Sequence, residues 1–149
     1  MNPAFWDSSA LFALCCLEPA TPVANTLSQQ HSIVVWWATP IELRGAIARR
    51  ARSGEWKPGE EREALRRLQD LRAGWLEIPP SSAVRERSLA LIAKHELRAA
   101  DSLQLAAALQ WVPASITAPN FISGDKRLLA AARAEGFAVH STTVNSQKR

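Results

Sequence analysis

Short apolar runs that alternate with helical segments constrain the fold of this chain most. The clearest run, HSIVVWWAT at residues 31–39, is rich in β-branched and aromatic residues, and its apolar residues are continuous rather than alternating. Such a run is typical of a strand that is buried on both faces, as in a parallel sheet. Further short strands are expected at residues 4–6, 75–78, 120–123 and 137–140. The sequence therefore predicts an α/β fold with a central, mainly parallel sheet.

Helical patterns separate these runs. They are expected at residues 8–17, 23–30, 39–54, 60–73, 81–97, 99–111 and 125–135. Thr39 followed by Pro40 is a typical helix start, with a cap residue and then proline in the first turn. In the helix of residues 81–97, we expect Leu89, Ile92 and Ala93 to face inward. The Ala- and Leu-rich helix of residues 99–111 is expected to be central.

The length and composition indicate one globular domain. The chain has 149 residues, of which 47% are hydrophobic and 21% are charged, which is enough to bury a substantial core. We expect a single domain at residues 1–141 and a loose polar tail at residues 142–149. The net charge of +4 is only weak support for a polyanionic partner.

The cysteine usage and the N-terminal segment favour a cytoplasmic protein. Cys15 and Cys16 are adjacent and cannot link distant segments, so we expect buried, reduced thiols. The apolar run ALFALCCL has no basic leader before it and is far shorter than the roughly 20 residues that span a bilayer. We therefore expect no membrane association.

Four acidic residues recur at expected helix starts. Asp7 follows the first strand and Asp125 follows the strand NFIS, whereas Glu42 and Asp101 lie near the starts of their helices. Taken singly, each has a structural explanation: the aspartates can cap helices and Glu42 can complement a helix dipole. Together they favour a site, because α/β proteins bind ligands beyond the carboxyl ends of parallel strands.

Clustered carboxylates indicate a hard divalent cation. Like charges in one place force some carboxylates to take up protons unless a cation joins them. Mg²⁺ or Mn²⁺ prefers oxygen ligands and suits phosphate substrates, and it can lower the pKa of a bound water. The sequence leaves open whether one or two ions bind.

The acidic residues lie in four motifs, which are, in order, WDSSAL, PIELRGAIARR, LRAADSLQLAAAL and FISGDKRLLAAARAEGF. Together these motifs resemble those of the PIN-domain ribonucleases, and within them the VapC-type toxins of bacterial toxin–antitoxin pairs. The third motif is the most specific, and the resemblance covers nearly the whole chain. Ser123 stands where the family usually has threonine, and it keeps the hydroxyl group.

The resemblance implies a PIN fold, with a parallel, mostly five-stranded sheet flanked by helices. It implies endonucleolytic cleavage of RNA that depends on Mg²⁺ or Mn²⁺, a homodimer, and inhibition by a small antitoxin. Asp7, Asp101 and Asp125 would hold the metal. Glu42 would either bind it through water or position the attacking water. Supporting hydrogen bonds would come from Ser8 and Ser123.

Basic and aromatic residues add weaker signals. The candidates for contacts with RNA phosphates are Arg49, Arg98, Lys126 and Arg127, although a solvated helix face also explains such charges. Of Trp36 and Trp37, at least one is expected in the core. Trp56 is expected to be exposed, where it could stack on a base or pack on a partner chain, and packing is favoured.

Two other functions compete with a nuclease. A non-catalytic PIN-like protein could hold RNA or a partner without cutting, but every acidic position of the motifs is present, and metal titration would separate the two. A haloacid-dehalogenase-type phosphatase also begins with a strand and an aspartate. That chemistry needs a second aspartate two residues later, where this chain has Ser9.

Overall fold

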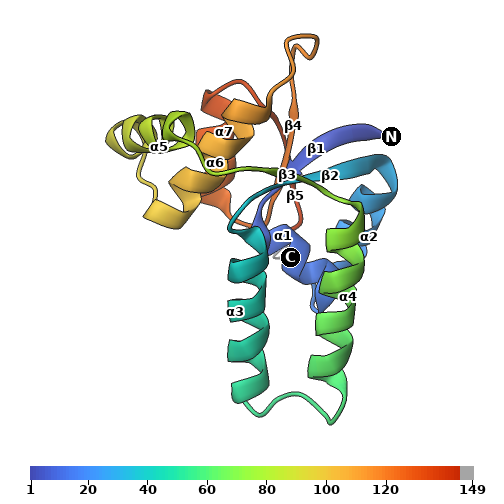
Figure 1. Ribbon diagram of the computed structural model, residues 1–149. Coiled ribbons are helices and arrows are strands. Elements are labelled where there is room, and N and C mark those ends of the chain that lie inside the picture. Colours follow the sequence, from blue (N-terminus) through green and yellow to red (C-terminus); the bar gives the residue numbers. More distant parts are fainter. Residues whose placement is uncertain (145–149) are drawn as a thin grey trace, which may run out of the picture.

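The computed structural model describes residues 1–144, and the end of the expected tail, residues 145–149, lies outside the described residues. Five parallel strands form one sheet in the order β3-β2-β1-β4-β5 (Figure 1). The strands are β1 Asn2–Trp6, β2 His31–Trp36, β3 Leu76–Ile78, β4 Asn120–Ser123 and β5 Ala138–Ser141. The prediction of a parallel α/β sheet is confirmed.

Seven helices within residues 1–144 connect and cover the strands. They are α1 Ser8–Cys15, α2 Thr21–Gln30, α3 Thr39–Arg52, α4 Glu60–Gly74, α5 Ser82–Lys94, α6 Ala99–Trp111 and α7 Lys126–Ala134. Side chains of α1 to α4 pack on one face of the sheet and side chains of α5 to α7 pack on the other. None of these helices combines the length and apolar character needed to cross a bilayer.

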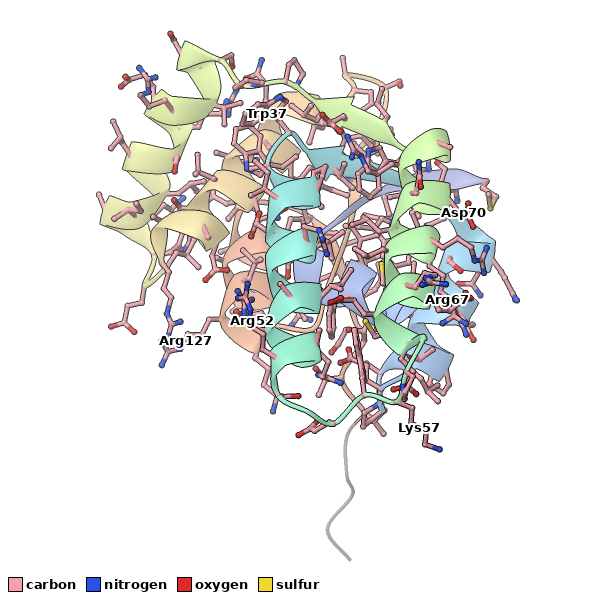
Figure 2. The ribbon with its side chains drawn as sticks, turned by 60° about the horizontal axis from the view of Figure 1, so that its bottom comes forward. Trp37, Arg52, Lys57, Arg67, Asp70 and Arg127 are labelled. Carbon is pink, nitrogen blue, oxygen red and sulfur yellow. The ribbon has the colours of Figure 1, made fainter. Side chains whose placement is uncertain are left out.

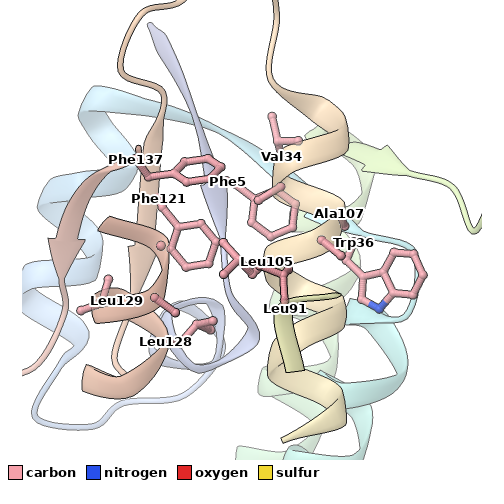
Figure 3. Packing of buried hydrophobic residues seen from close by; sticks show 14 of the residues in the cluster. Phe5, Val34, Trp36, Leu91, Leu105, Ala107, Phe121, Leu128, Leu129 and Phe137 are labelled. Atoms are coloured by element: carbon pink, nitrogen blue, oxygen red, sulfur yellow. The ribbon is translucent and has the colours of Figure 1, made fainter. Parts of the chain in front are cut away.

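Alternation along the strands divides the core between the two faces. Phe5 packs with Phe121 toward α5, α6 and α7, and the two rings are stacked at 5.6 Å (Figure 3). Ala4 and Trp6 point the other way, toward α1 and α3. Because successive strand side chains point to opposite faces, a strand covered on both sides must be apolar at every position. This is the physical reason for the continuous run in β2.

Several helix ends differ from the predicted ones by a few residues. Helix α1 ends at Cys15, because the chain turns extended at Cys16, where the Thr21 hydroxyl donates to the Cys16 carbonyl at 3.0 Å. The N-cap of α3 is Ala38 and not Thr39, whose buried side chain faces the sheet edge. Helix α5 ends at Lys94, before an extended His95.

The predicted inward face of α5 is wrong. Leu89 and Ile92 are 58% and 44% exposed, and Ala93 is exposed as well. The buried stripe is instead Val84, Ser88 and Leu91. The Ser88 hydroxyl shares a 2.6 Å hydrogen bond with that of Ser102 in α6. This buried polar pair therefore determines which face of α5 points inward, and apolar periodicity alone does not identify that face.

The first residues of the predicted loose tail are held in place. Thr142 is buried, and its backbone N–H donates to the Ser123 carbonyl at 3.1 Å. The Thr143 hydroxyl donates to the Gly124 carbonyl at 3.0 Å. These bonds continue the pairing of β5 with β4 past Ser141, so the chain at Thr142 still supports the end of β4.

The predictions for the cysteines and for Trp36 and Trp37 are confirmed. Cys15 and Cys16 are buried free thiols, and burial raises their pKa to about 12 and about 11. Trp36 is in the core, whereas Trp37 is exposed. The expectation that Trp56 is exposed is wrong, because this residue is partly buried and packs against the core of its own chain from the loop between α3 and α4. Those two helices lie side by side and project beyond the sheet (Figure 1).

Candidate active site

Asp7 lies at the carboxyl edge of the two central strands. It follows β1, and its backbone N–H donates to the Ile122 carbonyl of β4 at 2.9 Å. Its Oδ2 accepts hydrogen bonds from the hydroxyls of Ser9 at 2.5 Å and Ser123 at 2.8 Å. Asp7 occupies the N-cap position of α1, but its side chain makes no capping hydrogen bond. Capping therefore does not explain this carboxylate.

Burial raises the pKa of Asp7, because the carboxylate is only 5% exposed. The hydrogen bonds from Ser9 and Ser123 oppose this shift but do not cancel it. Burying a charge is costly unless it gains a partner of opposite charge or enough hydrogen bonds. The protein therefore keeps Asp7 in a position that favours either a proton or a cation.

Glu42 reaches the same region from the first turn of α3. Gln104 of α6 donates through Nε2 to Glu42 Oε1 at 2.9 Å and to the Ser8 hydroxyl at 2.8 Å. The pKa of Glu42 is raised to about 7, by burial first and then by the negative charge of Asp7. The hydrogen bonds from Gln104 and Ser8 act in the opposite direction, and Asp101 adds a smaller upward shift.

Asp101 and Asp125 line one cleft of about 480 Å³ beside this region. Burial and then the charges of Asp125 and Asp7 raise the pKa of Asp101. Asp125 is the N-cap of α7, and its Oδ1 accepts from the backbone N–H groups of Arg127 and Leu128. The capping explanation is thus correct for Asp125. It does not exclude a ligand, because a carboxylate has about four acceptor sites.

The predicted basic residues fall in two places. Arg98, Lys126 and Arg127 line the cleft with Asp101 and Asp125, together with Glu96. Arg49 lines a different groove, between α3 and α4. Ser8 stands beside Gln104, whereas Ser123 contacts Asp7 and also accepts from the Asp125 backbone N–H at 2.9 Å. The Ser123 hydroxyl therefore links two of the predicted acidic residues.

Sequence reasoning missed Ser9 and Gln104. The Ser9 hydroxyl donates to Asp7 and accepts from the Gly124 backbone N–H at 2.9 Å. A Cβ on Gly124 would lie 3.4 Å from the Ser9 hydroxyl and 3.0 Å from that of Thr142, so glycine leaves room for this approach. The signal for Gln104 was present: it is a polar residue three positions after Asp101 in an Ala- and Leu-rich helix.

The donor atoms suit a hard divalent cation. The negative charge of Asp7 raises the pKa of both Glu42 and Asp101, and an oxygen-binding cation relieves this repulsion. The buried Oε1 of Gln104, which contacts no donor in residues 1–144, is one further acceptor beside the carboxylates. Over the same residues, no three acidic, histidine or cysteine side chains form a ready-made ligand set. Ligation by three carboxylates therefore requires side-chain rotation.

A parallel α/β sheet with acidic residues along its carboxyl edge defines the class of this protein. The PIN domain matches residues 4–135, and the chain belongs to the PIN-domain family. This confirms the resemblance of the four motifs to that family. No curated protein sequence matches the chain.

Solved structures of the same fold include three with low sequence identity. PAE2754 from Pyrobaculum aerophilum is 20% identical, with a TM-score of 0.62 over 93% of this chain and 89% of that one. A toxin–antitoxin complex from Klebsiella pneumoniae is 18% identical, with a TM-score of 0.63 over 94% of this chain and 98% of that one. FitAcB from Neisseria gonorrhoeae is 17% identical, with a TM-score of 0.61 over 93% of this chain and 97% of that one. At these identities the likeness establishes the fold.

Replacing Gln104 by leucine should lower the activity of the site without unfolding the protein. The change removes the donor to Glu42, so the pKa of Glu42 should rise further, and an outer hydrogen bond of this kind is worth about 10- to 100-fold in activity. The free energy of unfolding should fall by about 1–3 kcal/mol, because Glu42 and the Ser8 hydroxyl lose their donor. The pH profile of RNA cleavage measures the effect: its acidic limb should move to higher pH.

The matched control is Gln110→Leu, which changes an exposed glutamine on the same helix. An unchanged rate and an unmoved pH profile in Gln104→Leu would show that Gln104 has a structural role only.

Proposed function

We propose that this protein is a metal-dependent endoribonuclease and the toxin of a toxin–antitoxin pair. The observation that carries the proposal is the gathering of Asp7, Glu42 and Asp101 at one sheet edge, where burial raises the pKa of all three. Carboxylates whose negative charge is disfavoured by burial and by neighbouring charges are suited to bind a cation. The proposal also rests on membership of the PIN-domain family.

In this proposal, Asp7, Asp101 and Asp125 hold one or two Mg²⁺ or Mn²⁺ ions. When bound, such an ion neutralises charge on a phosphodiester and lowers the pKa of water. Glu42, whose pKa is about 7, can accept a proton from an attacking water near neutral pH, or it can hold that water in place. The hydroxyls of Ser9 and Ser123 fix the orientation of Asp7.

The RNA would reach the acidic residues along the cleft that Asp101 and Asp125 line. Arg98, Lys126 and Arg127 stand in the same cleft and are exposed to solvent. Guanidinium and ammonium groups there can bind the phosphates on either side of the cleaved bond. The carboxylates alone would repel the RNA, so these cations are needed for its approach.

A cytoplasmic location, a small inhibitory antitoxin and a homodimer complete the proposal. The antitoxin is supported by the toxin–antitoxin complex among the structures of the same fold. The homodimer is supported by the exposed Leu89 and Ile92 on α5, which a second copy can cover.

The test is cleavage of a mixed pool of tRNA and mRNA by the purified protein, with Mg²⁺, with Mn²⁺ and with EDTA. We expect discrete fragments with either metal and none with EDTA. Binding of the RNA without cleavage under every metal condition would instead favour the alternative, a non-catalytic PIN-like protein that holds RNA or a partner.

A further inference from the structure

A groove of about 740 Å³ lies along the outer side of α3, between α3 and α4, and is separate from the cleft that Asp101 and Asp125 line. It is open to solvent, and its lining combines an aromatic ring, aliphatic side chains and several guanidinium groups. Its main lining residues are Trp37, Ile41, Arg44, Arg49, Arg52 and Arg72. Figure 2 shows Trp37 at the start of α3 and Arg52 near the far end of the same helix.

Trp37 presents a fixed aromatic surface at one end of this groove. Its side chain is 47% exposed, although it directly follows a buried strand. Its backbone N–H donates to the Ile78 carbonyl at 2.9 Å, and its ring packs edge-on against buried Trp36 at 6.4 Å. A ring held in this way loses little freedom when a planar group stacks on it.

The charge of the groove is strongly positive. Four arginines line it, with Glu77 as the one carboxylate among its lining residues, and Glu77 already accepts a hydrogen bond from the Trp75 indole at 3.1 Å. Arg44 and Arg52 are eight residues apart, so they lie about 12 Å apart along the helix axis. A stacked strand carries a phosphate about every 3.4 Å, so this span can meet several phosphates.

Gly45 shapes the middle of the groove. A Cβ at this position would lie 3.4 Å from Nη1 of Arg49, so the guanidinium rests directly over the glycine. A larger side chain at position 45 would displace Arg49 and fill the groove.

The start of α3 joins the groove to the acidic residues. Thr39 and Glu42 face Gln104 on the inner side of this turn, whereas Trp37, Pro40 and Ile41 face the groove on its outer side. A strand that leaves the acidic edge past this turn therefore meets Trp37 first and the arginines after it.

We propose that the groove binds single-stranded RNA beyond the cleaved bond, with one base stacked on Trp37 and phosphates on the four arginines. This inference rests on the proposed function, because it extends the path of the same substrate. An acidic protein segment would also be attracted by the arginines. An exposed, rigid indole beside planar guanidinium groups matches alternating bases and phosphates better.

The experiment measures binding of a fluorescein-labelled, mixed-sequence 12-nucleotide RNA by anisotropy, in EDTA so that no cleavage is needed. Trp37→Ala should weaken binding by about 5- to 100-fold, the range for loss of one stacked base, and Trp37→Phe should restore most of it. The double variant Arg44→Gln with Arg52→Gln should lower the slope of log K against log salt by about 1.4.

Two matched pairs separate the groove from general effects. Arg87→Gln removes an exposed arginine on α5 and should leave RNA binding nearly unchanged. Gly45→Leu should fill the groove and weaken binding, whereas Gly74→Ala, where a Cβ meets nothing within 4 Å, should not.

The inference is overturned if Trp37→Ala and the arginine variants bind this RNA as the wild type does. It is also overturned if a polyglutamate peptide of equal charge binds with the same dependence on Trp37, because the groove would then be a protein-docking surface. If the wild type cleaves RNA but the variants bind it normally, the nuclease proposal holds and the groove proposal is wrong. If the variants bind RNA more weakly but no cleavage occurs under any metal condition, the groove proposal holds and the nuclease proposal is wrong.

Discussion

Asp7→Asn should lower the rate of metal-dependent RNA cleavage by about 1000-fold or more. A bound cation supplies several kcal/mol of transition-state stabilisation, and each 1.36 kcal/mol corresponds to a factor of ten in rate. Asparagine keeps the size of the side chain and one oxygen acceptor but removes the negative charge. The measurement is the initial rate of fragment formation in Mg²⁺ and in Mn²⁺, compared with the wild type.

The same variant should fold normally and should melt at the same temperature or a few degrees higher in EDTA. Burial raises the pKa of Asp7, so its charge destabilises the metal-free protein, and asparagine carries no charge. Asp70→Asn, which changes an exposed carboxylate on α4, is the matched control and should retain full activity. Full activity in Asp7→Asn would refute the assignment of Asp7 to the metal.

Mn²⁺ or Mg²⁺ should raise the melting temperature more at pH 7.5 than at pH 5. A ligand at one hundred times its Kd stabilises the folded state by about 2.7 kcal/mol, or roughly 5–10 °C for a chain of this size. At pH 5 protons compete with the cation, because Asp7, Glu42 and Asp101 all have raised pKa values. Thermal melts at the two pH values, with and without metal, measure the difference.

In the metal-free protein, the contribution of these carboxyls to the free energy of unfolding should decrease as the pH rises. Folding raises the pKa of these three carboxyls, so the folded chain binds more protons than the unfolded chain. Their contribution to stability is therefore present at low pH. It is lost as the pH rises from about 4, where unfolded carboxyls ionise, to about 7, where Glu42 ionises in the folded state.

Glu42→Gln should flatten this slope in EDTA, and Asp7→Asn should abolish the stabilisation by metal at pH 7.5. A metal-induced shift of equal size at pH 5 and pH 7.5, or one that survives Asp7→Asn, would show that the cation binds elsewhere.

The order of elements and most of the acidic site were predictable from the sequence because they depend on local signals. The continuous apolar run in β2 requires burial on both faces, and this is the pattern of a parallel sheet. Asp7 and Asp125 each follow a strand, so their meeting at one edge follows from the parallel topology. Helix α6 was predicted with its observed ends, because its Ala- and Leu-rich composition leaves few alternatives.

Contacts between elements distant in the chain were not predictable. The burial of Ser88 depends on its partner Ser102, 14 residues further along the chain, so the predicted inward face of α5 was wrong. Gln104 became part of the site only because α6 brings it to Glu42, 62 residues away in sequence. Apolar periodicity does not identify a buried polar side chain. Its burial depends on a hydrogen-bond partner that the local sequence does not contain.

The two adjacent tryptophans show the same division within one short segment. The sequence by itself determined that this segment is a buried strand and that at least one indole belongs to the core. The tertiary structure decided that Trp36 is the buried ring and that Trp37, where β2 has ended, faces the groove between α3 and α4. Local pattern sets which residues need burial, whereas the packing of distant helices decides which surfaces stay uncovered for a ligand.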